Sequence, residues 1–377
     1  MKFELNEEQL QIQEMVRSLA RKSFAPGAAR TDGESIYPAE NMRQLAELGL
    51  LGMLFPAAYG GSETGAMGYN IALREVASGC ASTAVGMAVT NMVGETIWKF
   101  GNEEQRKRFL PGLASESIGP GAFALTEPSA GSDAGGMRTF AVEDGERFIL
   151  NGSKSFITNG GRAGVTIVLA LTQKEPRKIS AFLVEPGTKG FSAGKPENKL
   201  GLKGSDTVSL SFDECGIPKR NMLGAPGEGF RIAMSALDGG RIGIASQAIG
   251  IANAALETAV AYAKDRKQFG QPIAEFQAIQ WMLADSATEL DAAQLLVYRA
   301  ACLKDQGKPY TRESSMAKLF ASEAGNRVCH KAVQVLGGYG YISEYPVERH
   351  LRDVRVTTIY EGTSEVQRMV LSRSMVR

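Results

Sequence analysis

Apolar residues recur at helical spacing through the first 120 residues of the chain. Proline and glycine at 26–27 and between 56 and 61 interrupt this pattern and separate the predicted helices. Five residues of the first predicted helix share one face: Leu5, Leu10, Ile12, Val16 and Leu19. Residues 1–120 are therefore predicted to form an N-terminal α-helical domain.

From 121 to 228 the pattern changes to short runs of β-branched and aromatic residues. Runs at 165–171, 180–184 and 207–212 each end at glycine, proline or charged residues. The pair Asp144-Gly145 lies between two short extended segments, which is a strong hairpin signal. The pattern predicts a middle domain built on a mostly antiparallel sheet or small barrel.

Residues 229–377 return to helical spacing and are rich in alanine. Long stretches near 229–265, 273–305 and 312–336 are typical of an antiparallel four-helix bundle with close helix contacts. The predicted fold class is α+β multidomain, with helical, β and helical domains in that order.

Composition excludes several classes of function. The chain has 377 residues, 42 Lys and Arg against 41 Asp and Glu, and a net charge of +1, so no basic face for nucleic acid is expected. No uninterrupted apolar run approaches the roughly 18 to 20 residues of a membrane span. Because the first eight residues are acidic and amphipathic, unlike a signal or transit peptide, a cytoplasmic location is predicted.

Metal and hydrolase chemistry are also disfavoured. The chain has two histidines and four scattered cysteines, which predicts buried thiols in a reducing compartment and no metal site. The sequence contains no G-x-G-x-x-G after a strand, no P-loop and no G-x-S-x-G nucleophile elbow.

The segment 360–368, YEGTSEVQR, is the most informative part of the sequence. Gly362 permits a tight turn that would let Glu361 point into a cleft, and Ser364 is predicted as the N-cap of the helix that follows. An isolated Glu-Gly pair would more often be a surface turn. The helix has an apolar side formed by four residues: Val366, Met369, Val370 and Met375.

IYEGTSEVQR resembles the active-site segment of the flavin-dependent acyl-CoA dehydrogenases, in which this glutamate is the catalytic base. The order of the three domains is also that of the family. Together with LDGGRIGIASQAIGIA at 237–252, the resemblance covers essentially the whole chain and is closest to the short-chain (butyryl-CoA) members.

The resemblance implies FAD as cofactor, bound by the loops at 123–136 and 151–160 and by the segment after Glu361. Many members have tryptophan at the position of Phe156, which here keeps an aromatic cover over the flavin. Thr158 would lie near flavin N5. The implied FAD contacts from these segments are Phe123, Leu125, Thr126, Gly131, Ser132, Phe156, Thr158, Thr363 and Glu365.

A second set of residues matches segments that contact FAD from a neighbouring subunit, with Arg266 on the pyrophosphate. The resemblance therefore implies a homotetramer, built as a dimer of dimers. The residues of this set are Arg266, Phe269, Gln277, Gln334, Val335, Gly337 and Gly338.

Substrate contacts are implied for Ser132, Asp238, Arg241 and Gly362, with Arg241 suited to the anionic part of coenzyme A, at the opening of the first bundle helix. Residues 90–96 are expected to line the pocket for the acyl tail, with Glu95 favouring short or polar tails. Some relatives carry their catalytic glutamate at the position of Gly240, so a glutamate placed there is predicted to rescue a Glu361→Gln variant.

The function implied is α,β-dehydrogenation of an acyl-CoA thioester. Glu361 would remove the α proton, FAD would accept the β hydride, and an electron-transfer flavoprotein would take the electrons. Because a thioester α C–H is a weak acid, the pKa of the base is expected to be raised by desolvation. Two alternatives remain open: the same chemistry on a carrier-protein thioester, and a non-catalytic flavin-binding scaffold.

Overall fold

Helices form the first third of the chain, as the apolar spacing predicts. The computed structural model describes residues 4–376, so the first three residues of the acidic N-terminal segment lie outside it. The α-helices of this part are α1 (Glu7–Leu19), α2 (Ala25–Gly33), α3 (Ala39–Glu47), α4 (Gly65–Gly79), α5 (Ala81–Phe100) and α6 (Glu103–Ala114). A π-helical turn at Ala20–Phe24 joins α1 to α2.

Of the five residues predicted to share one face of the first helix, Leu5 precedes α1 and Leu10 points outward. Val16 is fully buried and Ile12 packs against the core, but Leu10 is 50 % exposed. Residues two positions apart in the sequence are about 200° apart around an α-helix, so Leu10 and Ile12 lie on opposite sides. The prediction for Leu10 was wrong for this reason.

A single eight-stranded sheet occupies the middle of the chain, in the order β6-β7-β3-β2-β4-β5-β8, with β1 paired to β4. Its strands are β1 (Gly121–Ala124), β2 (Phe140–Asp144), β3 (Arg147–Thr158), β4 (Val165–Gln173), β5 (Lys178–Val184), β6 (Phe191–Ala193), β7 (Thr207–Pro218) and β8 (Met222–Leu223). The predicted hairpin is confirmed, because Asp144 pairs with Arg147 across the turn between β2 and β3. Most pairs are antiparallel, while β4 pairs in parallel with β1 and β2.

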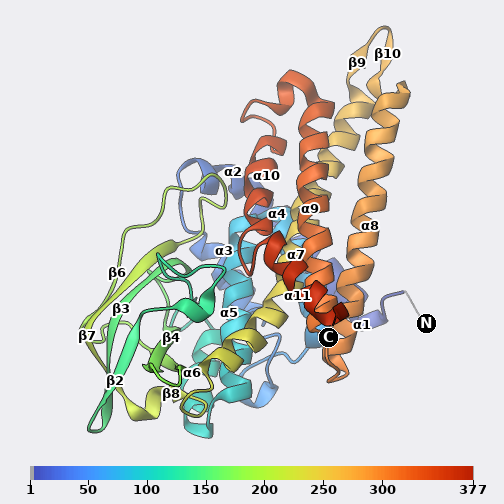
Figure 1. Ribbon diagram of the computed structural model, residues 1–377. Helices are drawn as coiled ribbons and strands as arrows, with labels where there is room; N and C mark the ends of the chain where they lie inside the picture. Colours follow the sequence, from blue (N-terminus) through green and yellow to red (C-terminus); the bar gives the residue numbers. More distant parts are fainter. Residues whose placement is uncertain (1–3, 377) are drawn as a thin grey trace.

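Long helices then form a second helical block beside the sheet (Figure 1). The elements of this block are α7 (Gly229–Asp265), β9 (Lys267–Gln268), β10 (Gln271–Pro272), α8 (Gln277–Asp305), α9 (Thr311–Leu336), α10 (Val347–Val354) and α11 (Ser364–Val376). Figure 1 places the β9–β10 hairpin at the tip of the long helices, away from the sheet.

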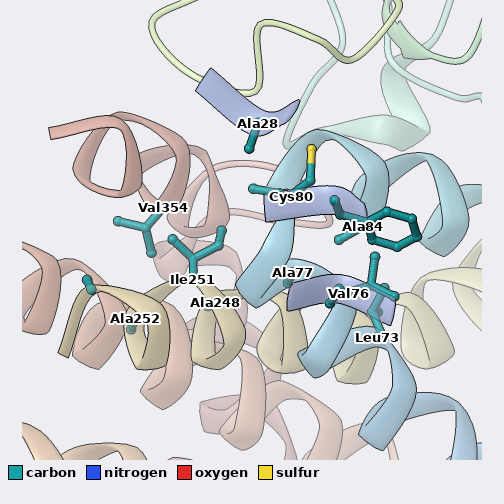
Figure 2. Packing of buried hydrophobic residues seen from close by; sticks show 14 of the residues in the cluster. Ala28, Leu73, Val76, Ala77, Cys80, Ala84, Ala248, Ile251, Ala252 and Val354 are labelled. Carbon is teal, nitrogen blue, oxygen red and sulfur yellow. The ribbon is translucent and has the colours of Figure 1, made fainter. Parts of the chain in front are cut away.

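Small residues allow α7 to pack closely against its neighbours. Figure 2 shows Ala248, Ile251 and Ala252 of α7 packed near side chains of α4 and α10. A Cβ on Gly250 would lie 2.2 Å from the backbone oxygen of Arg74 in α4, so only glycine fits there. The alanine-rich pattern of the sequence reflects this helix contact.

Helix α7 is also long and apolar enough to cross a membrane by length and composition alone. Of its most apolar window of 18 residues, 61 % is buried inside the protein. The apolarity of α7 is therefore explained by its position in the core. No other helix among residues 4–376 meets the same criteria.

Candidate active site

Glu361 lies on a short loop between a 3-10 turn at 355–358 and α11. Its backbone is left-handed, with φ of 55°, and Gly362 follows with φ of 90°. The sequence predicts the positive φ of Gly362 but not that of Glu361, because a side chain disfavours this region. Two consecutive left-handed residues turn the chain sharply before α11.

Two buried side chains hold the carbonyl oxygens of this loop. Nε2 of Gln367 donates to the oxygens of Glu361 (3.1 Å) and Gly362 (3.0 Å), and Nζ of Lys318 donates to the oxygen of Gly362 (2.7 Å). The backbone N–H of Glu361 donates no hydrogen bond within residues 4–376. The loop therefore has its carbonyls fixed, while the backbone N–H of Glu361 is free to donate to a ligand.

Thr363, not Ser364, caps helix α11. The helix begins at Ser364, and the hydroxyl of Thr363 accepts a hydrogen bond from the backbone N–H of Val366 at 3.3 Å. The hydroxyl of Ser364 is buried without a partner among the described residues. The predicted N-cap was thus wrong by one residue: the helix starts one residue earlier than a cap at Ser364 would place it, because the hydroxyl of Thr363 already caps its first turn.

The carboxyl group of Glu361 is poorly solvated. Its residue is half-buried, while its Oε2 atom is buried and has no hydrogen-bond partner within the described chain. Burial raises its pKa from 4.5 to about 7, and the nearby positive charges of Arg241 and Lys318 oppose the rise. A carboxylate with a pKa near neutrality can accept a proton from a weak carbon acid.

This carboxyl faces a cavity of about 670 Å³ between the sheet, α5, α7 and α11. Most of the residues predicted for flavin and substrate from one chain line this cavity. They are Phe123, Leu125, Thr126, Gly131, Ser132, Phe156, Thr158, Arg241, Glu361 and Gly362. Three of the four residues predicted on the apolar side of α11 also line it: Val366, Met369 and Val370. The fourth, Met375, is 74 % exposed.

Phe156 extends into this cavity from an unusual backbone. Its φ is 60° and its side chain is 67 % exposed, although the neighbouring Ile157 is buried. The strand β3 is irregular between Lys154 and Ile157, where its pairing with β7 shifts register. This bulge turns Phe156 away from the sheet core and toward the ligand space.

A buried ion pair that the sequence analysis missed joins the two loops at 123–136 and 151–160. Nζ of Lys154 lies 2.8 Å from Oε1 of Glu127 and also donates to the oxygen of Leu125. The carboxylate of Glu127 further accepts from the backbone N–H groups of Arg138 and Thr139. The lysine and glutamate are both in the quoted motifs, but only the fold brings them together.

Arg241 is inside α7 rather than at its opening. The helix begins at Gly229, so the segment 237–241 lies more than two turns along it. Arg241 is buried, and its Nη1 pairs with Oδ1 of Asp238 at 2.6 Å, while Asp238 also accepts from Thr311. Its Nε is buried without a partner within residues 4–376. A contact with the anionic part of coenzyme A stays a prediction.

The acyl-tail prediction for residues 90–96 was mostly wrong. Of that stretch, only Met92 lines the cavity, together with residues one to two turns earlier in α5: Val85, Ala88 and Val89. Glu95 is absent from the lining. Its carboxylate is paired with Nζ of Lys304 (2.8 Å) and Nζ of Lys99 (2.7 Å). Those two lysines hold it beside the cavity wall.

The residues predicted to contact FAD from another subunit lie in a different place. A pocket of about 610 Å³ at the β9–β10 end of the helices is lined by five of them: Arg266, Phe269, Val335, Gly337 and Gly338. The side chain of Phe269 is 94 % exposed. Gln277 and Gln334 lie on the adjoining ends of α8 and α9 without lining the pocket.

Thr363 and Glu365 line a third hollow, of about 420 Å³, with Arg327 and Arg355 on its wall. The predicted site residues that line a cavity are therefore divided among three hollows, while Asp238, Gln277 and Gln334 line none of these three. Within residues 4–376 no group of three or more His, Cys, Asp and Glu side chains is placed to hold a metal ion.

Comparison with known proteins gives a consistent result along the whole chain. Models of the acyl-CoA dehydrogenase N-terminal, middle and C-terminal domains match residues 6–117, 122–215 and 227–376. The chain is 48 % identical to the mitochondrial short-chain specific acyl-CoA dehydrogenase of Rattus norvegicus, over 99 % of this chain and 91 % of that protein. It is 46 % identical to the acryloyl-CoA reductase (NADH) of Anaerotignum propionicum, over 100 % of this chain and 96 % of that protein.

The fold agrees as closely with solved structures. Butyryl-CoA dehydrogenase from Megasphaera elsdenii superposes with a TM-score of 0.98 at 45 % identity, covering 100 % of both chains. The predicted three-part fold is confirmed.

Proposed function

The chain belongs to the acyl-CoA dehydrogenase family and is an oxidoreductase of that kind. We propose that it oxidises short-chain acyl-CoA thioesters to trans-2-enoyl-CoA, with Glu361 as the base. The observation that carries the proposal is the desolvated carboxyl of Glu361, whose Oε2 is buried without a partner among the described residues, on a residue that lines the same cavity as the predicted flavin segments.

The residues around the cavity fit FAD, the cofactor that the family uses. Phe156 offers an exposed aromatic face, and a Cβ added to Gly131 would meet no atom within 4 Å, so there is room for a close ligand. Thr126 and Thr158 supply hydroxyl groups on the same wall. When bound, FAD supplies the acceptor for the hydride that leaves the β carbon.

Glu361 then performs the proton transfer. Its carboxylate takes the α proton of the acyl group and becomes the neutral acid, which its desolvated position favours. The free backbone N–H of Glu361 is available to the thioester oxygen, where negative charge develops as the proton leaves. The positive charges of Arg241 and Lys318 lower the pKa of Glu361 and so favour the ionised carboxylate before reaction.

Assembly and electron transfer complete the proposal. The pocket at Arg266 and Phe269 lies at the far end of the helices from the sheet, which supports its use by the FAD of a second copy in a homotetramer. Electrons would leave to an electron-transfer flavoprotein, and the protein would act in the cytoplasm. These last two points rest on family analogy and on the sequence.

Anaerobic mixing with a panel of acyl-CoA thioesters tests the function. We expect a yellow protein with one FAD per chain, whose absorbance bleaches fastest with butyryl-CoA. Bleaching only by a carrier-protein thioester would favour the biosynthetic alternative. A colourless protein, or a bound flavin that no thioester bleaches, would instead favour the scaffold alternative and contradict the proposal.

A further inference from the structure

Two lysines of the described chain are fully buried, and their environments differ. The ammonium of Lys154 pairs directly with the carboxylate of Glu127 at 2.8 Å. The ammonium of Lys318, on α9, has no carboxylate within 4 Å among residues 4–376. Buried charges are normally paired, so the position of Lys318 requires an explanation.

The only hydrogen bond of Lys318 within the described residues goes to the loop that carries Glu361. Its Nζ donates to the carbonyl oxygen of Gly362 at 2.7 Å. The same oxygen accepts from Gln367, which is also fully buried and also holds the carbonyl of Glu361. A hydrogen bond from an ammonium group is about twice as strong as a neutral one.

This anchoring matters because the loop has an unfavourable backbone. Glu361 has a side chain and yet adopts φ of 55°, a region that such residues rarely occupy unless surrounding contacts impose it. Lys318 and Gln367 supply those contacts from α9 and α11. They fix where the side chain of Glu361 starts and hence where its carboxyl can reach.

The charge of Lys318 also acts on the carboxyl of Glu361. Burial lowers the pKa of Lys318 to about 8, so the ammonium is charged near neutral pH. The other charged groups acting on Lys318 are Arg241 of α7, Glu323 of α9 and Glu365 of α11. On the carboxyl of Glu361, Arg241 and Lys318 are the two positive charges, and Tyr69 of α4 and Tyr360 are the neighbouring phenols.

We propose that Lys318 is a positioning residue for the dehydrogenation: it holds the carbonyl of Gly362 so that Glu361 faces the substrate, and its charge favours the ionised carboxylate. The inference rests on the proposed function of Glu361. It gives a buried and otherwise unpaired ammonium a role in the reaction without any contact with the reacting atoms.

The test compares Lys318→Met with the wild-type holoenzyme. Methionine keeps the length and apolar stem of lysine but removes the donor and the charge. Loss of an adjacent opposite charge should raise the pKa of Glu361 by about one unit or more. At pH 7 the first-order rate of bleaching by butyryl-CoA should then fall about fivefold or more, with the pH profile displaced upward.

A measurement without substrate separates this role from a structural one. Infrared difference spectra of the oxidised holoenzyme, recorded across pH, report the protonated carboxyl of Glu361, and Glu361→Gln identifies its band. We expect the midpoint to rise in Lys318→Met and to stay near the wild-type value in Lys318→Arg, which keeps the charge.

Gln367→Met provides the second variant. It removes the two neutral hydrogen bonds to the loop and leaves the charge, so the bleaching rate should fall while the midpoint of Glu361 stays unchanged. Lys331→Met is the matched control. Lys331 lies on the same helix, with Nζ 3.3 Å from Glu289, remote from the loop, and its replacement should change neither quantity.

The outcomes are distinct. Wild-type midpoint and rate in folded Lys318→Met would overturn the inference. If Lys318→Met does not fold, Lys318→Gln replaces it: the amide keeps a donor but removes the charge, and a wild-type midpoint of Glu361 in that variant would overturn the inference. A wild-type protein that butyryl-CoA does not bleach would contradict the proposed function itself, whatever the variants do.

Discussion

A Cβ atom built on Gly240 would lie 2.6 Å from Oε2 of Glu361 and 3.0 Å from its Oε1. The carboxyl of Glu361 thus packs directly against the backbone of α7 at the position where some relatives of this family carry their own catalytic glutamate. Only glycine at 240 leaves the carboxyl in its present place.

Gly240→Ala should therefore impair the reaction without touching the base itself. The new methyl group must displace the carboxyl of Glu361, and we expect the bleaching rate with butyryl-CoA to fall at least about tenfold, since small displacements of reacting groups are costly. Gly239→Ala is a poor control because its Cβ would crowd Lys304. Gly27→Ala, where a Cβ meets nothing within 4 Å, should keep the wild-type rate.

The contact between Gly240 and the carboxyl of Glu361 argues against the rescue predicted from the sequence, in which Gly240→Glu restores activity to Glu361→Gln. In Glu361→Gln the amide keeps the space that a side chain at 240 would need, so adding Gly240→Glu should not restore activity. Removing the side chain at 361 opens that space. We expect the double variant Glu361→Gly with Gly240→Glu to bleach measurably faster than Glu361→Gly alone, as stopped-flow absorbance can determine.

Glu361→Gln alone tests the base. The amide keeps the size of the side chain but cannot accept the α proton, so the reductive half-reaction should slow by roughly 10²- to 10⁴-fold. FAD content and butyryl-CoA binding, measured by absorbance and calorimetry, should stay close to wild type. Near wild-type bleaching would remove Glu361 from the mechanism.

The pH dependence follows from the raised pKa of Glu361. Its value of about 7 lies above the usual 4.5, so the carboxyl is protonated and inactive below neutral pH. The bleaching rate should rise with pH through about 7 and level off above it. The stability of the folded protein changes in the opposite direction with pH. Burial favours the neutral acid of Glu361, so the stability that the neutral acid contributes is lost as pH rises through 7. Glu361→Gln should therefore raise the Tm at pH 8 more than at pH 5.

The buried pair of Lys154 and Glu127 predicts a stability effect. Lys154→Met leaves the carboxylate of Glu127 buried without its counter-charge, which should cost about 3–5 kcal/mol of unfolding free energy. Since both flavin loops attach to this pair, FAD should also dissociate more readily, as fluorescence titration of the released flavin would reveal. A variant with wild-type Tm and FAD retention would contradict this role.

Arg266→Ala tests whether the pocket at the β9–β10 end binds the FAD of a second subunit. Arg266 lies in the pocket at the β9–β10 end and its guanidinium stacks over the ring of Tyr339 at 5.7 Å, remote from Glu361. If that pocket serves the FAD of another copy, the variant should lose FAD affinity while its unliganded chain folds normally. Light scattering of wild type should show a tetramer. A wild-type monomer that retains FAD would contradict the shared site.

Local sequence patterns predicted much of the fold. Alanine-rich periodicity marked α7 at 229–265, and Asp144-Gly145 marked the β2–β3 turn, because both signals act over a few residues. The cap at Thr363 was missed because threonine and serine are both good N-cap residues, so residue type alone cannot choose between the neighbours Thr363 and Ser364. The left-handed backbone of Glu361 was missed because it depends on contacts from α9, far away in the sequence.

The site was predictable only where a motif carried it. Glu361 and the flavin loops were found because their sequence motifs resemble those of the family. Lys318 was not found, since a lysine in an α-helix is most often solvated. Its burial results from the packing of α9 against the loop and α11. The prediction that Glu95 lines the pocket for the acyl tail was wrong because the sequence does not show its ion pair with Lys304, which is 209 residues away.

The glycine contact between α4 and α7 has a consequence for how the protein opens. Because the backbone at Gly250 lies against that of Arg74 with no room for a side chain between them, any separation of the two helices breaks this contact. Gly240 and Arg241 belong to the same helix α7. Their amides should therefore exchange with solvent deuterium only when the whole molecule unfolds, whereas those of the β9–β10 hairpin should exchange through local fluctuations.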